Sequence, residues 1–489
     1  MSSDLFRISG FGFRGSRSAA LLILQGLSSI ALHSLAVLAF GFGIMPQAVG
    51  QASMQTILTN GPVSNRFNVV LLSEGYTSTQ LAQFLVDATN AVSELLAHQP
   101  YQEYSNYFNA FAIQIASGQS GSDHPSYSSY ANTYFNSTYD VASDRLITIP
   151  PNFADANYSH GQGKVDSLLQ TNMPDYGLAI LLVNDFTDGG SDGFGKTAIS
   201  SIGYGSPEIL THETGHVLAN LGDEYINANP GFPNTEEPNT TQQTNRLLIK
   251  WKAWISTNTP IPTPPTSAYS SVVGLFQGAH YHSTGWYRPS LDCLMRDLYV
   301  PFCDVCSEAL VLAIYQKVRP VDTFVPTSTN LSVSTTLPLT FSLTLLQPST
   351  HGLSVQWYTN NVAFSGATNL AITLLPTALG NGHHTISAVA RDSTSLVRND
   401  PTNLLAQTVT WAVNVNLTQL HLDSPLWLAG EKFAFRIVGT SPQGVAVEGS
   451  TNLLNWVRLT TNSLAAGQLW YTNSSASAWP HSFYRAVTP

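Results

Sequence analysis

The sequence predicts a multidomain protein in which a mixed α/β domain is followed by a β-sandwich and a small all-β module. Its 489 residues exceed the size of an ordinary single domain, so two or three domains are expected. Before Pro320, short apolar runs alternate with stretches of helical spacing, whereas after it Ser and Thr alternate with apolar residues at strand spacing. The boundary between the two fold types therefore lies near residue 320.

The first 50 residues have the pattern of an export signal. Arg7, Arg14 and Arg17 give a positive start, residues 19–45 are almost entirely apolar, and residues 48–50 are small, as before a signal-peptidase site. The apolar run is longer than a usual signal core, which leaves an uncleaved membrane anchor as the alternative. We therefore expect a secreted or periplasmic protein that contacts a membrane only if this segment stays uncleaved.

Residues 51–320 carry the alternating pattern of one α/β unit. A buried-strand run at 67–72 is followed by helical spacing over 78–97 and by a second strand at 108–115. Further strands are expected at 145–149, 177–183 and 197–202, a short helix at 164–169, and one more candidate helix at 247–255. A sheet backing a helix that begins near Ser206 is the expected architecture.

The most specific pattern of the chain is His212-Glu213-Thr-Gly-His216, which falls on that helix. Ser206-Pro207-Glu208 precedes it with residues typical of a helix start. Two imidazoles four residues apart project from one face of a helix, so both can bind a single Zn²⁺, and the Glu beside the first can reach water at the metal. We therefore expect one catalytic zinc ion with His212 and His216 as ligands.

A third ligand is expected just after the helix. Gly222 is predicted to end the helix in a left-handed cap and to turn the chain back towards the histidines. Asp223 directly follows this turn and is the preferred ligand, with Glu224 as the alternative. Two histidines and one carboxylate leave the fourth position of a zinc ion open, as catalysis requires.

Three cysteines, Cys293, Cys303 and Cys306, lie close together in the sequence. In an oxidising compartment they permit one disulfide and one remaining thiol, and the spacing does not assign the pair. The sequence Cys303-Asp-Val-Cys306 also resembles half of a zinc site, but no second Cys pair completes it.

Several segments resemble the immunoglobulin-A-peptidase family of bacterial zinc metallopeptidases, and they keep their order along the chain. They are Leu72-Ser-Glu-Gly-Tyr76-Thr, Ser120-Gly-Ser-Asp123-His-Pro, Asn184-Asp185, the zinc motif ending in Gly-Asp-Glu-Tyr225, and Tyr287-Arg-Pro followed by Cys-Leu-Met295-Arg. The resemblance implies a metzincin-like zincin domain, proteolysis of an extracellular protein or glycoprotein, and Met295 as the methionine turn beneath the metal. In the common metzincin pattern the third ligand comes six residues after the second histidine; that position is Gly222 here, and Asp223 is one residue further on.

The expected chemistry follows from these residue types. Glu213 takes a proton from the water that attacks the scissile carbonyl and returns it to the leaving amine. Tyr287 or Arg288, in the family-like segment near Met295, is the candidate donor to the developing oxyanion, with a structural role for either residue as the alternative. His280 and His282, spaced as strand neighbours on one face, are expected to be solvated or core histidines, with a place along the cleft as the alternative, and neither is given a metal role.

Residues 321–416 are predicted to form an immunoglobulin-like β-sandwich, with Trp357 in its core. The segment lacks the cysteine pair of antibody domains, so the inference rests on strand pattern. Strands are expected at 339–345, 353–358, 370–374, 384–391 and 407–415, with a turn at Gly380-Asn-Gly382. Residues 417–489 are expected to form the small β module, with strands that include 433–438 and 445–448.

Composition narrows the function class further. The formal net charge is −10, charged residues make up 10% of the chain, and no basic patch is present, so nucleic acid is not an expected partner. Two classes remain: a secreted zinc endopeptidase with β accessory domains, and a non-catalytic adhesion or binding protein with a vestigial zinc site. The intact motif His212, Glu213 and His216 favours the endopeptidase.

Overall fold

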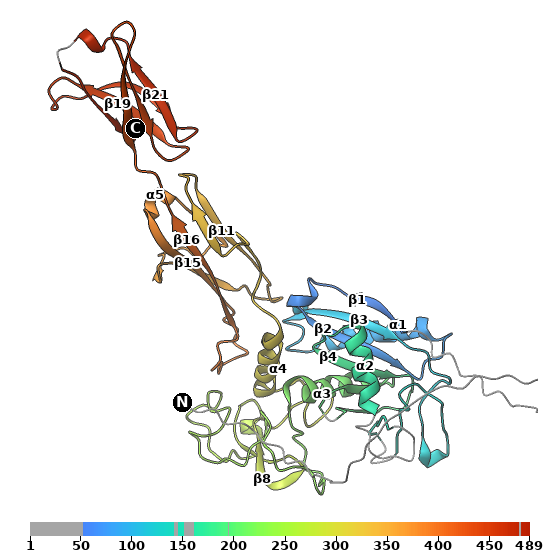
Figure 1. The fold of residues 1–489 in the computed structure, drawn as a ribbon. Helices are drawn as coiled ribbons and strands as arrows, with labels where there is room; N and C mark the ends of the chain where they lie inside the picture. Colours follow the sequence, from blue (N-terminus) through green and yellow to red (C-terminus); the bar gives the residue numbers. More distant parts are fainter. Residues whose placement is uncertain (1–51, 141–144, 151–160, 194, 479–480) are drawn as a thin grey trace, which may run out of the picture. The chain divides into compact units, whose positions relative to one another are not determined.

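The computed structural model describes residues 52–140, 145–150, 161–193, 195–478 and 481–489 (Figure 1). The expected export signal at residues 1–50 lies outside the described residues. Within the described part of the chain, no helix combines the length and the apolar character that a membrane crossing requires.

A six-stranded sheet forms the centre of the N-terminal domain (Figure 1). Its strands are β1 Ser53–Leu58, β2 Phe67–Glu74, β3 Phe108–Gln114, β4 Leu178–Val183, β5 Gly190–Ser191 and β6 Ala198–Ser201. The strand order is β1-β3-β2-β4-β6-β5; the four inner strands are parallel and the two edge strands are antiparallel to their neighbours. The inner strands coincide with four of the predicted strands, whereas residues 145–149 form only isolated bridges.

Helices cover both faces of this sheet. They are α1 Leu81–Leu95, α2 Gln162–Asn172, α3 Ser206–Ala219 and α4 Asp304–Lys317. Successive residues of β2 point to opposite faces, so Val69 and Leu71 pack in the core with α1, α3 and α4, while Val70 and Leu72 pack in the core with α2. Burial on both faces explains why β2 reads as a continuous apolar run.

The segment 247–255, a candidate helix in the sequence, forms successive turns instead. Most of its backbone hydrogen bonds connect residues three apart, as from Lys252 to Ile249 and from Trp254 to Trp251. Side-chain contacts hold it in this form, because the indole of Trp251 donates to the Gly274 carbonyl at 2.8 Å and that of Trp254 donates to Glu308 at 2.8 Å. Tertiary contacts therefore override the helical spacing here.

A β-sandwich begins directly after α4. One sheet has the order β14-β11-β9 and the other β10-β16-β15-β12-β13. The strands are β9 Val321–Val325, β10 Asn330–Val333, β11 Leu339–Leu345, β12 Ser354–Thr359, β13 Val362–Ala363, β14 Ala371–Leu374, β15 Gly382–Arg391 and β16 Ala406–Val415. The core contains the fully buried Trp357 stacked on Trp411, with ring centroids 5.8 Å apart.

The last described segment forms a separate small core between two three-stranded sheets. Their orders are β17-β18-β21 and β20-β19-β22. The strands are β17 His421–Leu428, β18 Lys432–Val438, β19 Gly444–Ser450, β20 Val457–Ser463, β21 Gln468–Asn473 and β22 Phe483–Val487.

Buried polar contacts join the β-sandwich to the α/β domain. Arg66, just before β2, donates two hydrogen bonds to Asp322 on β9, at 2.6 and 2.7 Å. The hydroxyls of Tyr104 and Tyr315 donate to Asp392 at 2.8 and 2.7 Å.

Candidate active site

Helix α3 carries both histidines of the predicted motif and ends directly after them. Its last residue is Ala219, and Asn220 adopts the left-handed conformation, with φ 51° and ψ 41°. The prediction that Gly222 is the left-handed cap is therefore wrong; Asn also tolerates this conformation, and it comes two residues earlier. Position 222 instead favours glycine for reasons of space, because an added Cβ would lie 2.5 Å from the carboxylate of Glu237.

Backbone carbonyls orient both imidazoles. His212 Nδ1 lies 2.9 Å from the Leu294 carbonyl oxygen, and His216 Nδ1 lies 2.6 Å from the Leu221 carbonyl oxygen. A carbonyl only accepts, so each Nδ1 carries a proton, and each Nε2 is the ring nitrogen that can bind a metal when it is unprotonated. The two Nε2 atoms lie 3.1 Å apart.

Asp223 completes this cluster. Its Oδ1 lies 3.2 Å from His212 Nε2 and 3.4 Å from His216 Nε2, and the Tyr281 hydroxyl donates to its Oδ2. Burial raises the pKa of Asp223, but the adjacent histidines outweigh it and hold this pKa below the usual value. Its Oδ1 is buried, with no hydrogen-bond partner among the described residues.

The spacing of these three donor atoms fits a tetrahedral metal. Metal–donor distances of about 2.0–2.1 Å and a tetrahedral angle place neighbouring donors about 3.3 Å apart. The donors of His212, His216 and Asp223 lie 3.1–3.4 Å from one another. Two imidazoles and one carboxylate are also the donor types of catalytic zinc sites.

Glu224, the alternative third ligand, lies in another cluster. Its side chain is fully buried, its Oε1 accepts a hydrogen bond from Asn239 at 2.9 Å, and the same atom lies 3.5 Å from Cys306 Sγ. The metal-competent group around the histidines contains Asp223 rather than Glu224.

A cavity of about 300 Å³ opens beside the cluster. His212, Glu213 and Tyr225 line it together with Gly190 on the edge strand β5. Burial raises the pKa of Glu213 to about 7, although His212 and His216 act against this shift. A carboxylate with a pKa near 7 both accepts and returns a proton at neutral pH.

Met295 packs against α3 between the two histidines. It is fully buried, and a Cβ added at Gly215 would lie 2.9 Å from its sulfur. The chain turns tightly here, with the Arg296 N–H donating to the Cys293 carbonyl at 2.8 Å. This turn also presents the Leu294 carbonyl to His212.

Tyr287 and Arg288 are not brought to this cavity. Both lie at the end of β8 (His282–Arg288), which pairs with β7 (Phe276–Ala279). Tyr287 packs in the hydrophobic core, and the Arg288 guanidinium donates to the carbonyls of Gln277 and Gly278. Neither residue lines the cavity, where Tyr225 offers a hydroxyl instead.

The side chains of His280 and His282 neither line the cavity nor join the group of His212, His216 and Asp223, although the His280 N–H donates to the Asp223 carbonyl at 2.9 Å. His280 stacks on Trp286 with centroids 3.8 Å apart, and its Nδ1 lies 3.0 Å from Glu237 Oε2. His280 therefore has a packing role. The tyrosine between them, Tyr281, reaches Asp223 instead, and sequence reasoning missed it.

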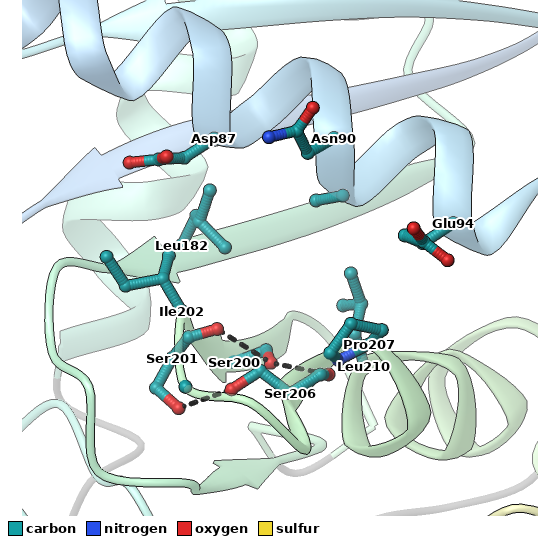
Figure 2. A pocket seen from close by; sticks show the side chains of 12 residues that line it. Asp87, Asn90, Glu94, Leu182, Ser200, Ser201, Ile202, Ser206, Pro207 and Leu210 are labelled. Carbon is teal, nitrogen blue, oxygen red and sulfur yellow. Dashed lines mark hydrogen bonds between the residues drawn. The ribbon is translucent and has the colours of Figure 1, made fainter.

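A second cavity, of about 140 Å³, lies between α1 and the start of α3 (Figure 2). Asp87, Asn90 and Glu94 of α1 face it from one side, and Ser201 and the start of α3 face it from the other. His212, Glu213 and His216 do not line it, so it is separate from the candidate active site.

Comparison with known proteins places most of the N-terminal domain in one family. The family model described as IgA Peptidase M64 matches residues 56–268 and 265–314. No match was found among curated proteins.

Three solved structures are similar to parts of this chain, with TM-scores of 0.13–0.14. The apo structure of Bacteroides uniformis β-glucuronidase 3 has 10% identity and TM-score 0.14, covering 42% of this chain and 28% of that chain. The Clostridium thermocellum CbhA fibronectin(III)-like modules have 12% identity and TM-score 0.14, covering 30% of this chain and 77% of that chain. A chaperone–tip adhesin complex of CFA/I fimbriae has 11% identity and TM-score 0.13, covering 34% of this chain and 89% of that chain.

Proposed function

Since the chain belongs to the IgA peptidase M64 family, we propose that it is a secreted zinc endopeptidase that hydrolyses peptide bonds of extracellular proteins. The observation that carries this proposal is the convergence of His212, His216 and Asp223 on one point beside Glu213. The packing of Met295 beneath Gly215 supports a metzincin-like domain. Export rests on the pattern of residues 1–50.

The three converging residues would hold the zinc ion. The buried Oδ1 of Asp223 has no hydrogen-bond partner among the described residues, and a cation would satisfy it. When bound, Zn²⁺ supplies Lewis-acid chemistry, polarising a carbonyl and making water more acidic. The Nδ1 contacts of His212 and His216 keep both rings in the orientation that binding needs.

Glu213 would act as general base and then as general acid. It accepts a proton from water as the water oxygen attacks the scissile carbonyl carbon, and it gives this proton to the amine nitrogen as the carbon–nitrogen bond breaks. Burial raises the pKa of the Glu213 carboxyl above its ordinary value, which favours both taking and returning a proton near neutral pH. Tyr225 replaces Tyr287 as the proposed hydroxyl donor to substrate, because Tyr225 lines the cavity with Glu213.

The decisive test compares two isosteric substitutions on the same helix. Glu213→Gln should keep zinc and lower cleavage of an unfolded protein substrate by about 10²–10⁴-fold, the usual contribution of general acid–base catalysis. Glu208→Gln, in the first turn of α3 and outside the cavity, should keep both zinc and cleavage. Equal cleavage by wild type and Glu213→Gln would refute the assigned base. A zinc-loaded wild type that cleaves no protein substrate would favour the adhesion function instead.

Asp223→Asn tests the third ligand. The amide keeps the shape of the side chain and removes its charge, so we expect weaker zinc binding together with reduced cleavage. Unchanged zinc affinity in this variant would exclude Asp223 as a ligand.

A further inference from the structure

Three cysteines and one carboxylate meet in the core directly behind the active site. Cys293 precedes the Met295 turn, Cys303 and Cys306 lie at the start of α4, and Glu224 follows Asp223. One ligand atom from each lies within 4.8 Å of the others, and all four residues are buried.

We propose that Glu224, Cys293, Cys303 and Cys306 bind a second zinc ion, which has a structural role. Three sulfur donors and one oxygen donor form a closed four-ligand set without a position for water, as in structural zinc sites. The sequence pattern Cys303-Asp-Val-Cys306 supplies half of this site, and the fold supplies the other half from two distant segments.

The distances within the cluster fit zinc coordination. A zinc–sulfur distance of about 2.3 Å and a tetrahedral angle place two sulfurs about 3.8 Å apart. With a zinc–oxygen distance of about 2.0 Å, the sulfur–oxygen separation is about 3.5 Å. Cys293 Sγ and Cys306 Sγ lie 3.6 Å apart, and Cys306 Sγ lies 3.5 Å from Glu224 Oε1.

The carboxylate is the observation that favours a metal over a disulfide. Glu224 is fully buried, and its Oε2 has no hydrogen-bond partner among the described residues. Burying a carboxylate is costly unless it is paired or bound to a metal. A disulfide would use two cysteines and leave the buried carboxylate beside the third thiol with no cation to offset its charge, whereas a bound cation would engage all four side chains and offset that charge.

Nearby N–H groups support a negatively charged ligand set. The backbone N–H of Cys303 points to Cys293 Sγ at 3.3 Å, and Asn239 donates to Glu224 Oε1 at 2.9 Å. Zinc binding would release the thiol protons to solvent. These donors would then stabilise the charge that remains on the ligands.

The second zinc ion would link three segments of the chain that position residues of the first site. Glu224 directly follows the third catalytic ligand, and its N–H donates to the Met295 carbonyl at 2.8 Å. Cys293 lies at the start of the Met295 turn, and Cys303 is the N-cap of α4. Asp223 and the carbonyl that orients His212 would therefore both depend on this ion for their positions.

The test measures zinc content in the full chain with the two sites removed separately. His212→Ala/His216→Ala removes the catalytic ligands, so its readout does not depend on activity. We expect about two zinc ions per wild-type chain and about one in this double variant. X-ray absorption of the zinc in the double variant should show three sulfur neighbours at about 2.3 Å.

Cys303→Ser removes one ligand of the proposed site with little disturbance of the helix. Residue 303 is the N-cap of α4, with φ −69° and ψ 167°, and Ser is a favoured N-cap. This variant should lose about one zinc ion, while Ser307→Ala, on the same helix and outside the cluster, should keep both.

Two results would overturn the second site. One is a double histidine variant that holds no zinc and shows one free thiol after denaturation, which indicates a disulfide. The other is the same variant with no zinc and three free thiols, which indicates buried cysteines alone. Absence of cleavage with both zinc ions present would refute the proposed activity and leave the second site standing.

Discussion

Gly215→Ala probes the contact between α3 and the methionine turn. The added Cβ would lie 2.9 Å from Met295 Sδ and 3.2 Å from atoms of Leu221 and Phe302. Ordinary contacts begin at 3.4 Å, so the sulfur would have to move by about 0.5 Å (3.4 − 2.9). Met295 is fully buried, which leaves it little room to do so.

Two opposing effects set the size of the change. Overpacking a core costs about 1–3 kcal/mol, while replacing a helical glycine by alanine gains about 1 kcal/mol. We therefore expect Gly215→Ala to lower the free energy of unfolding by about 1 kcal/mol. Movement of Met295 also displaces the Leu294 carbonyl that orients His212, and loss of such support weakens zinc binding by about 10–100-fold.

Gly163→Ala on α2 is the matched control. This glycine is exposed, and no atom lies within 4 Å of an added Cβ, so the substitution should stabilise the protein by up to about 1 kcal/mol and leave zinc affinity unchanged. Urea unfolding and competition with a zinc chelator measure the two quantities. Equal effects of the two substitutions on both quantities would refute the reasoning about Met295.

The remaining predictions concern the domain contact and the β-sandwich. Arg66→Ala should lower the free energy of unfolding by about 1.5–3 kcal/mol at pH 7, because Asp322 loses two charge-assisted hydrogen bonds. Burial raises the pKa of Asp322, but the Arg66 contacts outweigh it and lower this pKa. The stabilisation is therefore present above the usual Asp pKa of about 3.9 and is lost as the pH falls through the lowered folded value. The free energies of unfolding of wild type and Arg66→Ala should converge at acid pH. A difference that stays constant with pH would contradict the assignment of this stabilisation to the Arg66–Asp322 contacts. Trp357→Ala should destabilise the β-sandwich by about 3–5 kcal/mol while the α/β domain keeps peptidase activity, as calorimetry and a cleavage assay would show. If Trp357→Ala loses activity at temperatures where the α/β domain stays folded, the core of the β-sandwich and the core of the α/β domain are not independent of each other.

Local pattern was sufficient for the four inner strands and for α1, α2 and α3, but it predicted neither β1 nor α4. The run at 67–72 and the helical spacing over 78–97 depend on burial of whole strands and faces, and both are visible in sequence. The segment 247–255 was mispredicted because two indole side chains hold it in turns through contacts with Gly274 and Glu308. Contacts with residues this distant in the sequence cannot be recognised from the local pattern of residues 247–255.

The residues of the candidate site likewise divide into those that local sequence pattern predicts and those that it does not. His212 and His216 follow from helical periodicity alone, since i and i+4 share a face. The path of the chain after the helix was less predictable: the left-handed residue is Asn220, and the side chains of Asp223 and Glu224 enter different clusters. The role given to Tyr287 depended on proximity in sequence to Met295, but β8 directs this side chain into the core. Tyr225 could have been found from the sequence, because it is the last residue of the family-like segment that follows the zinc motif.

The acceptors that fix the two imidazoles are main-chain oxygens, those of Leu294 and Leu221. Substituting either leucine therefore leaves the acceptor oxygen itself in the chain, so the protonation of Nδ1 in both rings does not depend on which side chain stands at position 294 or 221. Leu294 also lines the cavity, so its side chain can be changed to alter the cavity wall without removing the acceptor that faces His212.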